Sequence, residues 1–217
     1  MKIIITAGGT EEPIDSVRKI TNIGTGKLGS KIANRLSLSL KKSDTIYYIC
    51  NKNSIMPVEN ENIKIILTTD TDSVIKAFES LKYENIDFVI HSMAISDYKV
   101  EGAYIEEDSI FKKIDTSSKM KSNNDEIFLK LVRTPKIVDK IKNWFPKTKL
   151  ISFKLLNNVS SEELLNVAKK QKERTNSDLV IANDLSKIRG GNHIGYFIGD
   201  TLKEVRSKEK ISKEEFK

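Results

Sequence analysis

The sequence predicts an α/β fold, namely a Rossmann-like, mostly parallel sheet with helices on both faces, in a single domain. Strand-like runs that are almost continuously apolar alternate along the chain with amphipathic segments of helical period. The length of 217 residues suits one domain of this class. Ligands of such sheets bind outside the carboxyl ends of the strands, so we expect the functional residues just after each strand.

The first third of the chain contains three strands and a helix. An apolar run predicts a buried strand at residues 2–6, and further strands are expected at 45–50 and 63–67. A helix is expected at 27–42, because apolar residues recur there at helical spacing. The predicted apolar stripe consists of Leu28, Ile32, Leu36 and Leu40.

The middle of the chain begins with a helix from Asp70 that carries acids in its first turn. A strand follows at 86–91. Residues 92–124 are polar and without a clear period, so we expect an irregular segment there. Regular structure is expected to return at 126–132.

The last third alternates in the same way. Thr134 is a candidate N-cap, with Pro135 at the first position of a helix. Ser160 and Glu163 form a capping box that opens another helix. Strands are expected at 149–156, 178–184 and 193–198, the last of the chain.

Composition excludes several classes of protein. With 38% hydrophobic and 31% charged residues, the chain is neither a disordered nor a membrane protein, and no apolar run approaches the roughly 20 residues needed to span a bilayer. The net charge is +7, but lysines are interspersed with acids and aromatic residues are only 7%, so we expect no nucleic-acid partner. A basic pocket for small phosphorylated ligands fits this charge.

The chain has a single cysteine, Cys50, and the sequence enters a strand without a visible signal peptide. An internal disulfide is therefore excluded, and we expect a cytoplasmic protein. Cys50 ends an apolar run and is predicted to be a buried strand thiol.

A glycine motif, Gly24–Gly29, fits the pattern G-x-G-x-x-G of dinucleotide-binding folds. An NAD(P)-binding Rossmann-type reductase is therefore an alternative reading. Two features count against it: the motif lies far beyond the first strand, and the second strand ends in Cys50-Asn51-Lys52 without the acid that grips a ribose. A P-loop is also excluded, because Leu28 follows Gly26-Lys27.

The turns after the first strand are suited to an anion. Gly8 and Gly9 let backbone N–H groups approach a ligand closely. Asn22 leads into Gly24–Gly26, and the helix from Lys27 offers N–H donors and a positive dipole end. We therefore expect a phosphate site at residues 24–27.

Later strand ends carry further polar residues. Asp97 follows the strand at 86–91, where it could meet a metal–phosphate complex, and the small Ala94 leaves room for a ligand. A mobile flap is expected around residues 115–126, in which Lys119 and Lys121 would act on a polyphosphate. Asn183 and Asp184 end another strand. His91 is expected to be a hydrogen-bonded core histidine.

Taken together, these segments resemble phosphopantothenoylcysteine synthetase, the phosphopantothenate–cysteine ligase of coenzyme A biosynthesis. The resemblance runs over about residues 3–185 and rests, in order, on ITAGGTEEPIDSVRKITNIGTGKLG, MAISDY, KMK, TPKIV, ISFK and DLVIAND. The length is similar to the stand-alone bacterial type, without a fused flavin-dependent decarboxylase. The bacterial type uses CTP and the eukaryotic type ATP.

The resemblance implies a two-step reaction. The carboxylate of 4′-phosphopantothenate attacks the α-phosphate of CTP, and the amine of L-cysteine then displaces CMP from the acyl-cytidylate. It implies Mg²⁺, a homodimer, and catalytic roles for Asn22, near the acyl-nucleotide, and Lys119, in the flap. Asp97 is implied as the residue that meets the metal, and Asn183 and Asp184 as substrate-binding.

The strand ends and the resemblance together predict the nucleotide-binding residues, which are Gly8, Gly9, Gly24, Thr25, Gly26, Lys27, Ala94, Asp97, Lys121, Pro135, Lys136, Ile137, Val138, Phe153 and Lys172. Two departures from the family pattern stand out. Ser122 replaces the last lysine of the flap motif K-x-K-K. The positions of the family's paired helix lysines fall near Gln171 and Thr175 in this chain. We therefore expect the nearby Lys172 to take the place of those lysines.

Three functions are therefore compared. The first is the CTP-dependent ligase, the second is the reductase, and the third is a nucleotide-sensing module without catalysis. In the third case Asn22 and Lys119 would be dispensable to the fold and to any assay.

Overall fold

The computed structural model describes residues 1–189 and 192–208. Contacts divide the chain into two compact units, which we describe separately: a first unit of Met1–Asn85 and Ser92–Ile137, and a second unit of Ile86–His91 and Val138–Lys217. Among the helices described, none combines the length and the apolar character that a membrane crossing requires.

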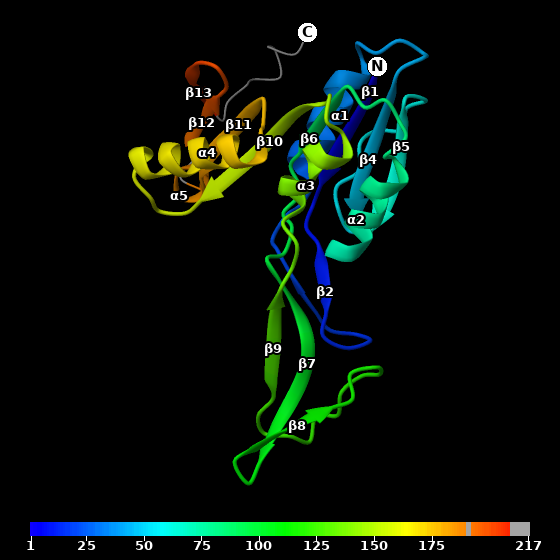
Figure 1. Cartoon of the computed structure of the whole chain (residues 1–217), viewed down its shortest axis with the longest axis vertical. Coiled ribbons are helices and arrows are strands. Elements are labelled where there is room, and N and C mark those ends of the chain that lie inside the picture. Colours follow the sequence, from blue (N-terminus) through cyan, green and yellow to red (C-terminus); the bar gives the residue numbers. More distant parts are fainter. Residues whose placement is uncertain (190–191, 209–217) are drawn as a thin grey trace. The chain divides into compact units, whose positions relative to one another are not determined.

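The first unit contains three parallel strands in the order β1 (Lys2–Ala7), β4 (Thr45–Asn51) and β5 (Ile63–Thr68). Nearly every residue of β1 and β4 is buried. Because successive side chains of a strand point to opposite faces, such continuous burial means that both faces of these strands are covered. The α/β class with parallel strands is therefore confirmed in this unit (Figure 1).

Helix α1 (Lys27–Ser37) is shorter than predicted, and its predicted apolar stripe was only partly right, because Ile32 and Leu36 are half-buried whereas Leu40 lies beyond the helix. Leu28 is exposed, whereas Gly29, Ser30 and Ala33 are buried. A Cβ added at Gly29 would lie 2.5 Å from Ala7 Cβ, so only glycine allows this close approach of helix to strand. Small residues thus decide which face of α1 meets β1.

Helix α2 (Thr71–Ser80) begins where the sequence predicted. The side chain of Asp70 accepts a hydrogen bond from Ser73 N at 2.8 Å and caps the helix.

The predicted irregular segment at 92–124 is wrong over much of its length. Strands β7 (Tyr98–Glu107), β8 (Ile110–Ile114) and β9 (Phe128–Arg133) form an antiparallel sheet in the order β8-β7-β9 (Figure 1). Its strands mix exposed apolar and charged residues, and this mixture hid the period-2 signal. Two short strands, β2 (Glu11–Pro13) and β3 (Lys19–Thr21), form a further pair that was not predicted.

In the second unit, β6 (Phe88–His91), β10 (Lys149–Leu156) and β11 (Leu179–Asp184) are parallel. Strand β12 (Asn192–Ile198) pairs antiparallel with β11, and β13 (Leu202–Lys208), which was not predicted, pairs antiparallel with β12. The mostly parallel sheet of the predicted fold class is therefore confirmed. The boundaries of one domain over 1–217 and of a flap at 115–126 stay predictions.

Helices accompany these strands. Helix α4 (Ser161–Thr175) begins at its predicted cap, where Ser160 Oγ accepts a bond from Glu163 N at 3.0 Å. A short helix α5 (Leu185–Arg189) follows β11. Helix α3 (Ile137–Trp144) begins three residues after Thr134. The Thr134 hydroxyl donates instead to the Ser96 carbonyl at 2.5 Å, so the predicted N-cap at Thr134 was wrong.

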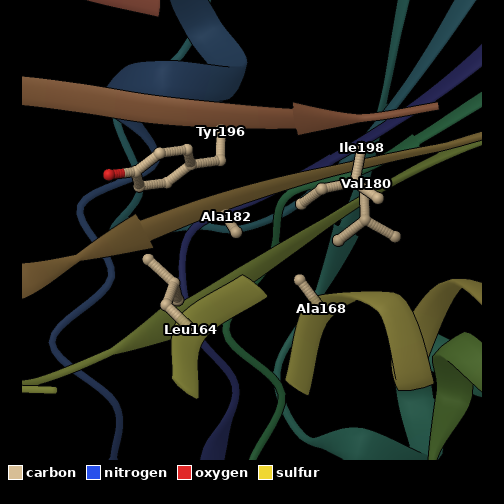
Figure 2. Close-up of a cluster of buried hydrophobic side chains, with 6 residues drawn as sticks. All are labelled: Leu164, Ala168, Val180, Ala182, Tyr196 and Ile198. Carbon is tan, nitrogen blue, oxygen red and sulfur yellow. The ribbon is translucent and has the colours of Figure 1, made fainter. Parts of the chain in front are cut away.

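The core of this unit lies between α4 and the strands β11 and β12. Figure 2 shows Leu164 and Ala168 on α4 facing apolar side chains from the two strands. The cluster consists of Leu164, Ala168, Val180, Ala182, Tyr196 and Ile198. Tyr196 keeps its hydroxyl hydrogen-bonded, to Ser161 Oγ at 3.1 Å, so its ring can be buried without an unpaired polar group.

Candidate active site

Two glycine turns of the first unit pack directly against each other. A Cβ added at Gly24 would lie 2.7 Å from the Gly8 carbonyl oxygen, and one added at Gly9 would lie 2.8 Å from the Asn22 carbonyl oxygen. Gly8 and Gly26 also have positive φ angles of 84° and 77°. Only glycine therefore allows these backbones to lie so close with these angles. We call residues 8–9 and 22–27 the glycine cradle.

The segment after β6 joins this cradle through Ala94. Its N–H donates to the Gly8 carbonyl at 2.8 Å, and its carbonyl accepts from Thr10 N at 3.1 Å. The same carbonyl accepts the Asn22 side-chain amide, Nδ2, at 3.2 Å. Asn22 is exposed, so its amide is oriented at the rim of the cradle while remaining open to a ligand.

The cradle ends at the N-terminus of α1. Gly26 occupies the N-cap position and has no side chain with which to cap the helix. Lys27 N donates to Thr25 Oγ1 at 3.3 Å, and the Thr25 and Lys27 side chains are exposed. An uncapped helix start with a positive dipole end is suited to a phosphate group.

Ser54 is a residue of the cradle that sequence reasoning missed. It lies in the loop after β4, and a Cβ added at Gly26 would meet Ser54 Cβ at 3.0 Å. The neighbouring Ile55 N donates to the Thr25 carbonyl at 2.9 Å. The rule that ligands bind beyond strand ends could have found this loop, because it follows β4 directly.

Asp97 is exposed and forms an ion pair with Lys136, with Nζ to Oδ1 at 2.5 Å. Its carbonyl accepts from Thr134 N at 3.0 Å, which keeps Pro135 and Lys136 beside it. In the described chain no three histidine, cysteine, aspartate or glutamate residues group as a metal site. The single carboxylate of Asp97 fits a Mg²⁺ ion that arrives already bound to a triphosphate, since Mg²⁺ keeps most of its ligands from phosphates and water.

The predicted flap carries its two lysines, Lys119 and Lys121, exposed on either side of a buried Met120. No interaction described for these lysines links them to the glycine cradle. The segment is attached elsewhere: Met120 N donates to Asp15 Oδ2 at 3.1 Å. The flap is therefore held at one point between its lysines.

The remaining predicted residues are Ile137, which ends the first unit, and residues of the second unit. Ile137 is buried, and Val138, Phe153 and Lys172 are half-buried. Asn183 Nδ2 donates to the Ile194 carbonyl at 2.9 Å.

Asp184 is buried and fastens two segments of the second unit. Its Oδ1 accepts from Asn158 N at 2.9 Å and from the N–H and hydroxyl of Ser186 at 2.9 and 2.8 Å. Burial opposes its ionisation, but these bonds hold the pKa of Asp184 below its usual value. The carboxylate thus anchors the loop after β10, and its contact with substrate stays a prediction.

Gln171 and Thr175, at the positions of the family's helix lysines, are buried in a hydrogen-bonded cluster. Gln171 Nε2 donates to Ser152 Oγ at 3.1 Å, and Thr175 Oγ1 donates to the Gln171 carbonyl at 2.8 Å. Ser177 Oγ completes the cluster, 3.0 Å from Ser152 Oγ and 2.6 Å from Thr175 Oγ1. These positions therefore belong to the interior of this chain.

The two reactive side chains near the strand ends are unsuited to nucleophilic or acid–base work. Burial raises the pKa of the Cys50 thiol to about 11, so the thiolate is scarce at neutral pH. Burial lowers the pKa of His91 to about 4, so the imidazole is neutral there. The exposed polar groups among the predicted site residues of the first unit include the Asn22 amide, the Asp97 carboxylate and the Lys27 ammonium.

Comparison with known proteins gives the family. The model of the DNA/pantothenate metabolism flavoprotein C-terminal domain matches residues 1–216. The chain belongs to this family. Within the DNA/pantothenate metabolism flavoprotein C-terminal domain family, the resemblance to phosphopantothenoylcysteine synthetase, first seen in the sequence motifs, is confirmed.

Similar proteins agree with this assignment. The chain is 35% identical over 185 residues to the coenzyme A biosynthesis bifunctional protein CoaBC of Thermococcus kodakarensis, and 32% identical over 204 residues to that of Methanocaldococcus jannaschii. These matches cover 85% and 94% of this chain but 41% and 43% of the relatives, so the chain spans about two fifths of their length.

A solved structure supports the fold. The DNA/pantothenate metabolism flavoprotein from Streptococcus pneumoniae is 34% identical to this chain, with a TM-score of 0.82. The match covers 97% of this chain and 94% of that one. The predicted α/β class is thereby confirmed for the family as well as for this chain.

Proposed function

We propose that this protein is a phosphopantothenate–cysteine ligase that makes 4′-phosphopantothenoylcysteine for coenzyme A biosynthesis. The observation that carries the proposal is the glycine cradle, in which two glycine turns, an uncapped helix start and an exposed, oriented Asn22 converge. Membership of the family and the names of the CoaBC relatives support the same activity.

In the first step a carboxylate oxygen of 4′-phosphopantothenate attacks the α-phosphorus of the nucleotide. A P–O bond forms, the bond to the β-phosphate breaks, and pyrophosphate leaves with the electron pair. Negative charge builds on the phosphate oxygens in this step. The backbone donors of the cradle are pre-oriented dipoles that stabilise this charge, and the Lys119 ammonium of the flap adds a positive charge beside it.

In the second step the amine of L-cysteine attacks the acyl carbonyl carbon. A C–N bond forms, the nucleoside monophosphate leaves, and the nitrogen gives its proton to solvent. Negative charge builds on the carbonyl oxygen as the tetrahedral intermediate forms. The Asn22 amide, already oriented at the rim by Ala94, supplies a hydrogen-bond donor to that oxygen.

We propose CTP as the nucleotide and Mg²⁺ as its cation, with Asp97 meeting the ion. Lys136 is paired with Asp97, and we propose that its ammonium contacts phosphate oxygens of the same complex. The base would be read by Pro135–Val138 and Phe153, with Lys172 in place of the family's helix lysines. Gln171 and Thr175 are neutral and buried, so neither of these two positions offers a cation to the base.

We also propose a homodimer in the cytoplasm. Large apolar side chains are exposed on the β7–β9 sheet, a feature that is costly unless a partner covers it. They are Tyr98, Ile110, Phe111, Phe128, Leu129 and Leu131. Replacing Leu131 by glutamate should shift the protein to monomers in sedimentation experiments, and an unchanged mass would count against this interface.

Pyrophosphate release tests the function. The protein should release pyrophosphate only when 4′-phosphopantothenate is present, faster with CTP than with ATP, and should form the amide product and CMP once L-cysteine is added. Release that does not depend on 4′-phosphopantothenate would refute the ligase. A nicotinamide titration tests the reductase alternative, and we expect no binding.

A further inference from the structure

Asp15 is a buried carboxylate in the turn after β2, and its two oxygens serve different partners. Oδ1 accepts from Val17 N at 2.9 Å and Arg18 N at 2.7 Å, which closes the turn. Oδ2 accepts from the backbone N–H of Met120, which lies 105 positions further along the chain, at 3.1 Å. The Asp15 side chain has 0% exposure, so these bonds form away from water.

Arg18 completes the contact from the other side. Its Nη1 pairs with Asp15 Oδ2 at 3.2 Å, and its Nη2 lies 3.5 Å from the Met120 carbonyl. Both backbone polar groups of Met120 thus face the Asp15–Arg18 pair, and the Met120 side chain is 6% exposed. Burial opposes ionisation of Asp15, but the N–H donors keep its pKa below the usual value, so the carboxylate is charged at neutral pH.

Met120 is the point at which the flap is held. In the described chain, the hydrogen bonds that join residues 115–126 to segments outside them all involve Met120. A cavity of about 380 Å³ lies beside the contact, between the turn at 13–16 and Thr116–Ser117. Thr116 and Ser117 therefore border open space, whereas Met120 is held by its buried side chain and by the charged bond to Asp15.

We propose that Asp15 is a positioning residue that orders the lysine-bearing flap by holding Met120 between Lys119 and Lys121. This inference rests on the proposed function for its effect on the reaction. An ordered flap presents Lys119 in one place before the nucleotide arrives, so less conformational entropy is lost as the transition state forms. Asp15 itself touches no reacting atom.

Asp15→Asn separates the two duties of this side chain. The amide oxygen keeps accepting from Val17 and Arg18 in the turn, whereas an NH₂ group now faces the Met120 N–H, which it cannot accept. Asp70→Asn is the matched control, since it makes the same change at a helix N-cap where asparagine serves as well as aspartate. Met120→Pro removes the same contact from the other side, because proline has no N–H. Met120→Ala is its control, because it also loses the methionine side chain but keeps the N–H.

We expect hydrogen exchange of peptides within 115–126 to be at least about tenfold faster in Asp15→Asn than in wild type, because one charged hydrogen bond is lost. Exchange of the same peptides should be at least about tenfold faster in Met120→Pro than in Met120→Ala. Peptides of β1 and β4 should keep wild-type exchange. In pyrophosphate release, kcat/KM of Asp15→Asn should fall about tenfold, but not further when Lys119→Ala is already present, because both changes act through one side chain.

Unchanged flap exchange in Asp15→Asn would overturn the proposal. Additive losses in the Asp15→Asn, Lys119→Ala double variant would overturn it too, since Asp15 would then act independently of Lys119. If wild type releases no pyrophosphate with CTP or ATP, the ligase function fails. The exchange comparison still decides, in that case, whether Asp15 holds the flap.

Discussion

At the scale of single residues, two of the side chains proposed to work in the reaction, Asn22 and Asp97, are exposed but restrained by neighbours. Asn22 is fixed by one hydrogen bond to Ala94, and Asp97 by its pairing with Lys136. Lys119 follows the position of Met120. Polar groups that are already oriented before the substrate binds stabilise a transition state without further reorganisation. The following two predictions rest on this principle.

Asn22→Asp should leave the burst of pyrophosphate largely intact and slow amide formation by about 10²–10³-fold, as for loss of an oxyanion donor. The carboxylate cannot donate to the carbonyl oxygen and repels its growing charge. Rapid-quench measurement of both products separates the steps. Asn34→Asp is the control, because its oxygen still accepts from Val58 N. Equal rates in both steps would mean that Asn22 is misassigned.

Lys119→Ala should slow pyrophosphate release by about 100-fold, because a cation that offsets charge on the triphosphate is removed. The melting temperature should stay within about 1 °C, since the side chain is exposed and contributes little to packing. Lys112→Ala, in the adjacent strand and paired with Glu107, is the control and should release pyrophosphate normally. A wild-type rate for Lys119→Ala would remove this lysine from the mechanism.

At the scale of elements, the cradle depends on two turns that touch only because they lack side chains. Gly24→Ala should destabilise the protein by about 1–3 kcal/mol, since its Cβ would lie 2.7 Å from the Gly8 carbonyl oxygen. It should also weaken CTP binding at least about tenfold, because the turns must separate. Titration calorimetry measures this binding. Gly199→Ala, whose Cβ would have no neighbour closer than 3.7 Å, is the control.

Elements also show which sequence signals were sufficient. The strands predicted at 45–50 and 149–156, the helix start near Asp70 and the cap Ser160 agree with the structure within a residue or two, because their signals are local. The buried face of α1 was not, because Gly29 and Ala33 are buried for closeness to β1 rather than for hydrophobicity. Strands β7 and β8 were missed because they mix exposed apolar residues with charged ones. Strand β9 lies where regular structure was expected to return, at 126–132.

At the scale of the whole molecule, buried ionisable groups set the response to acid. The folded pKa of His91 is lowered to about 4, below the unfolded value of about 6.5. As pH falls, the unfolded state therefore takes up a proton before the folded state does. The free energy of unfolding decreases between about pH 6.5 and about pH 4. Lys149 and Lys142 hold the pKa of Asp178 at about 2, although burial opposes its ionisation. Protonation of Asp178 therefore lowers the free energy of unfolding only at a more acidic pH than that of His91.

The free energy of unfolding should accordingly fall by about 2 kcal/mol more in wild type than in His91→Gln between pH 7.5 and pH 5. Urea unfolding at each pH measures it, and the variant serves as the reference because it lacks the titrating imidazole. Parallel pH profiles for the two proteins would show that the imidazole does not stay neutral in the fold.

The sequence by itself determined the α/β class, the order of the parallel strands and helices along the chain, and the family, because these depend on local periodicity and on contiguous motifs. It also predicted that Gly8, Gly24 and Asn22 matter. Only the tertiary structure decided that the two glycine turns lie against each other, that Ser54 lies against them, and that Asp15 accepts a bond from Met120, 105 positions away. Contacts between residues so far apart in sequence leave no local pattern, since they arise only when the folded backbone brings the segments together.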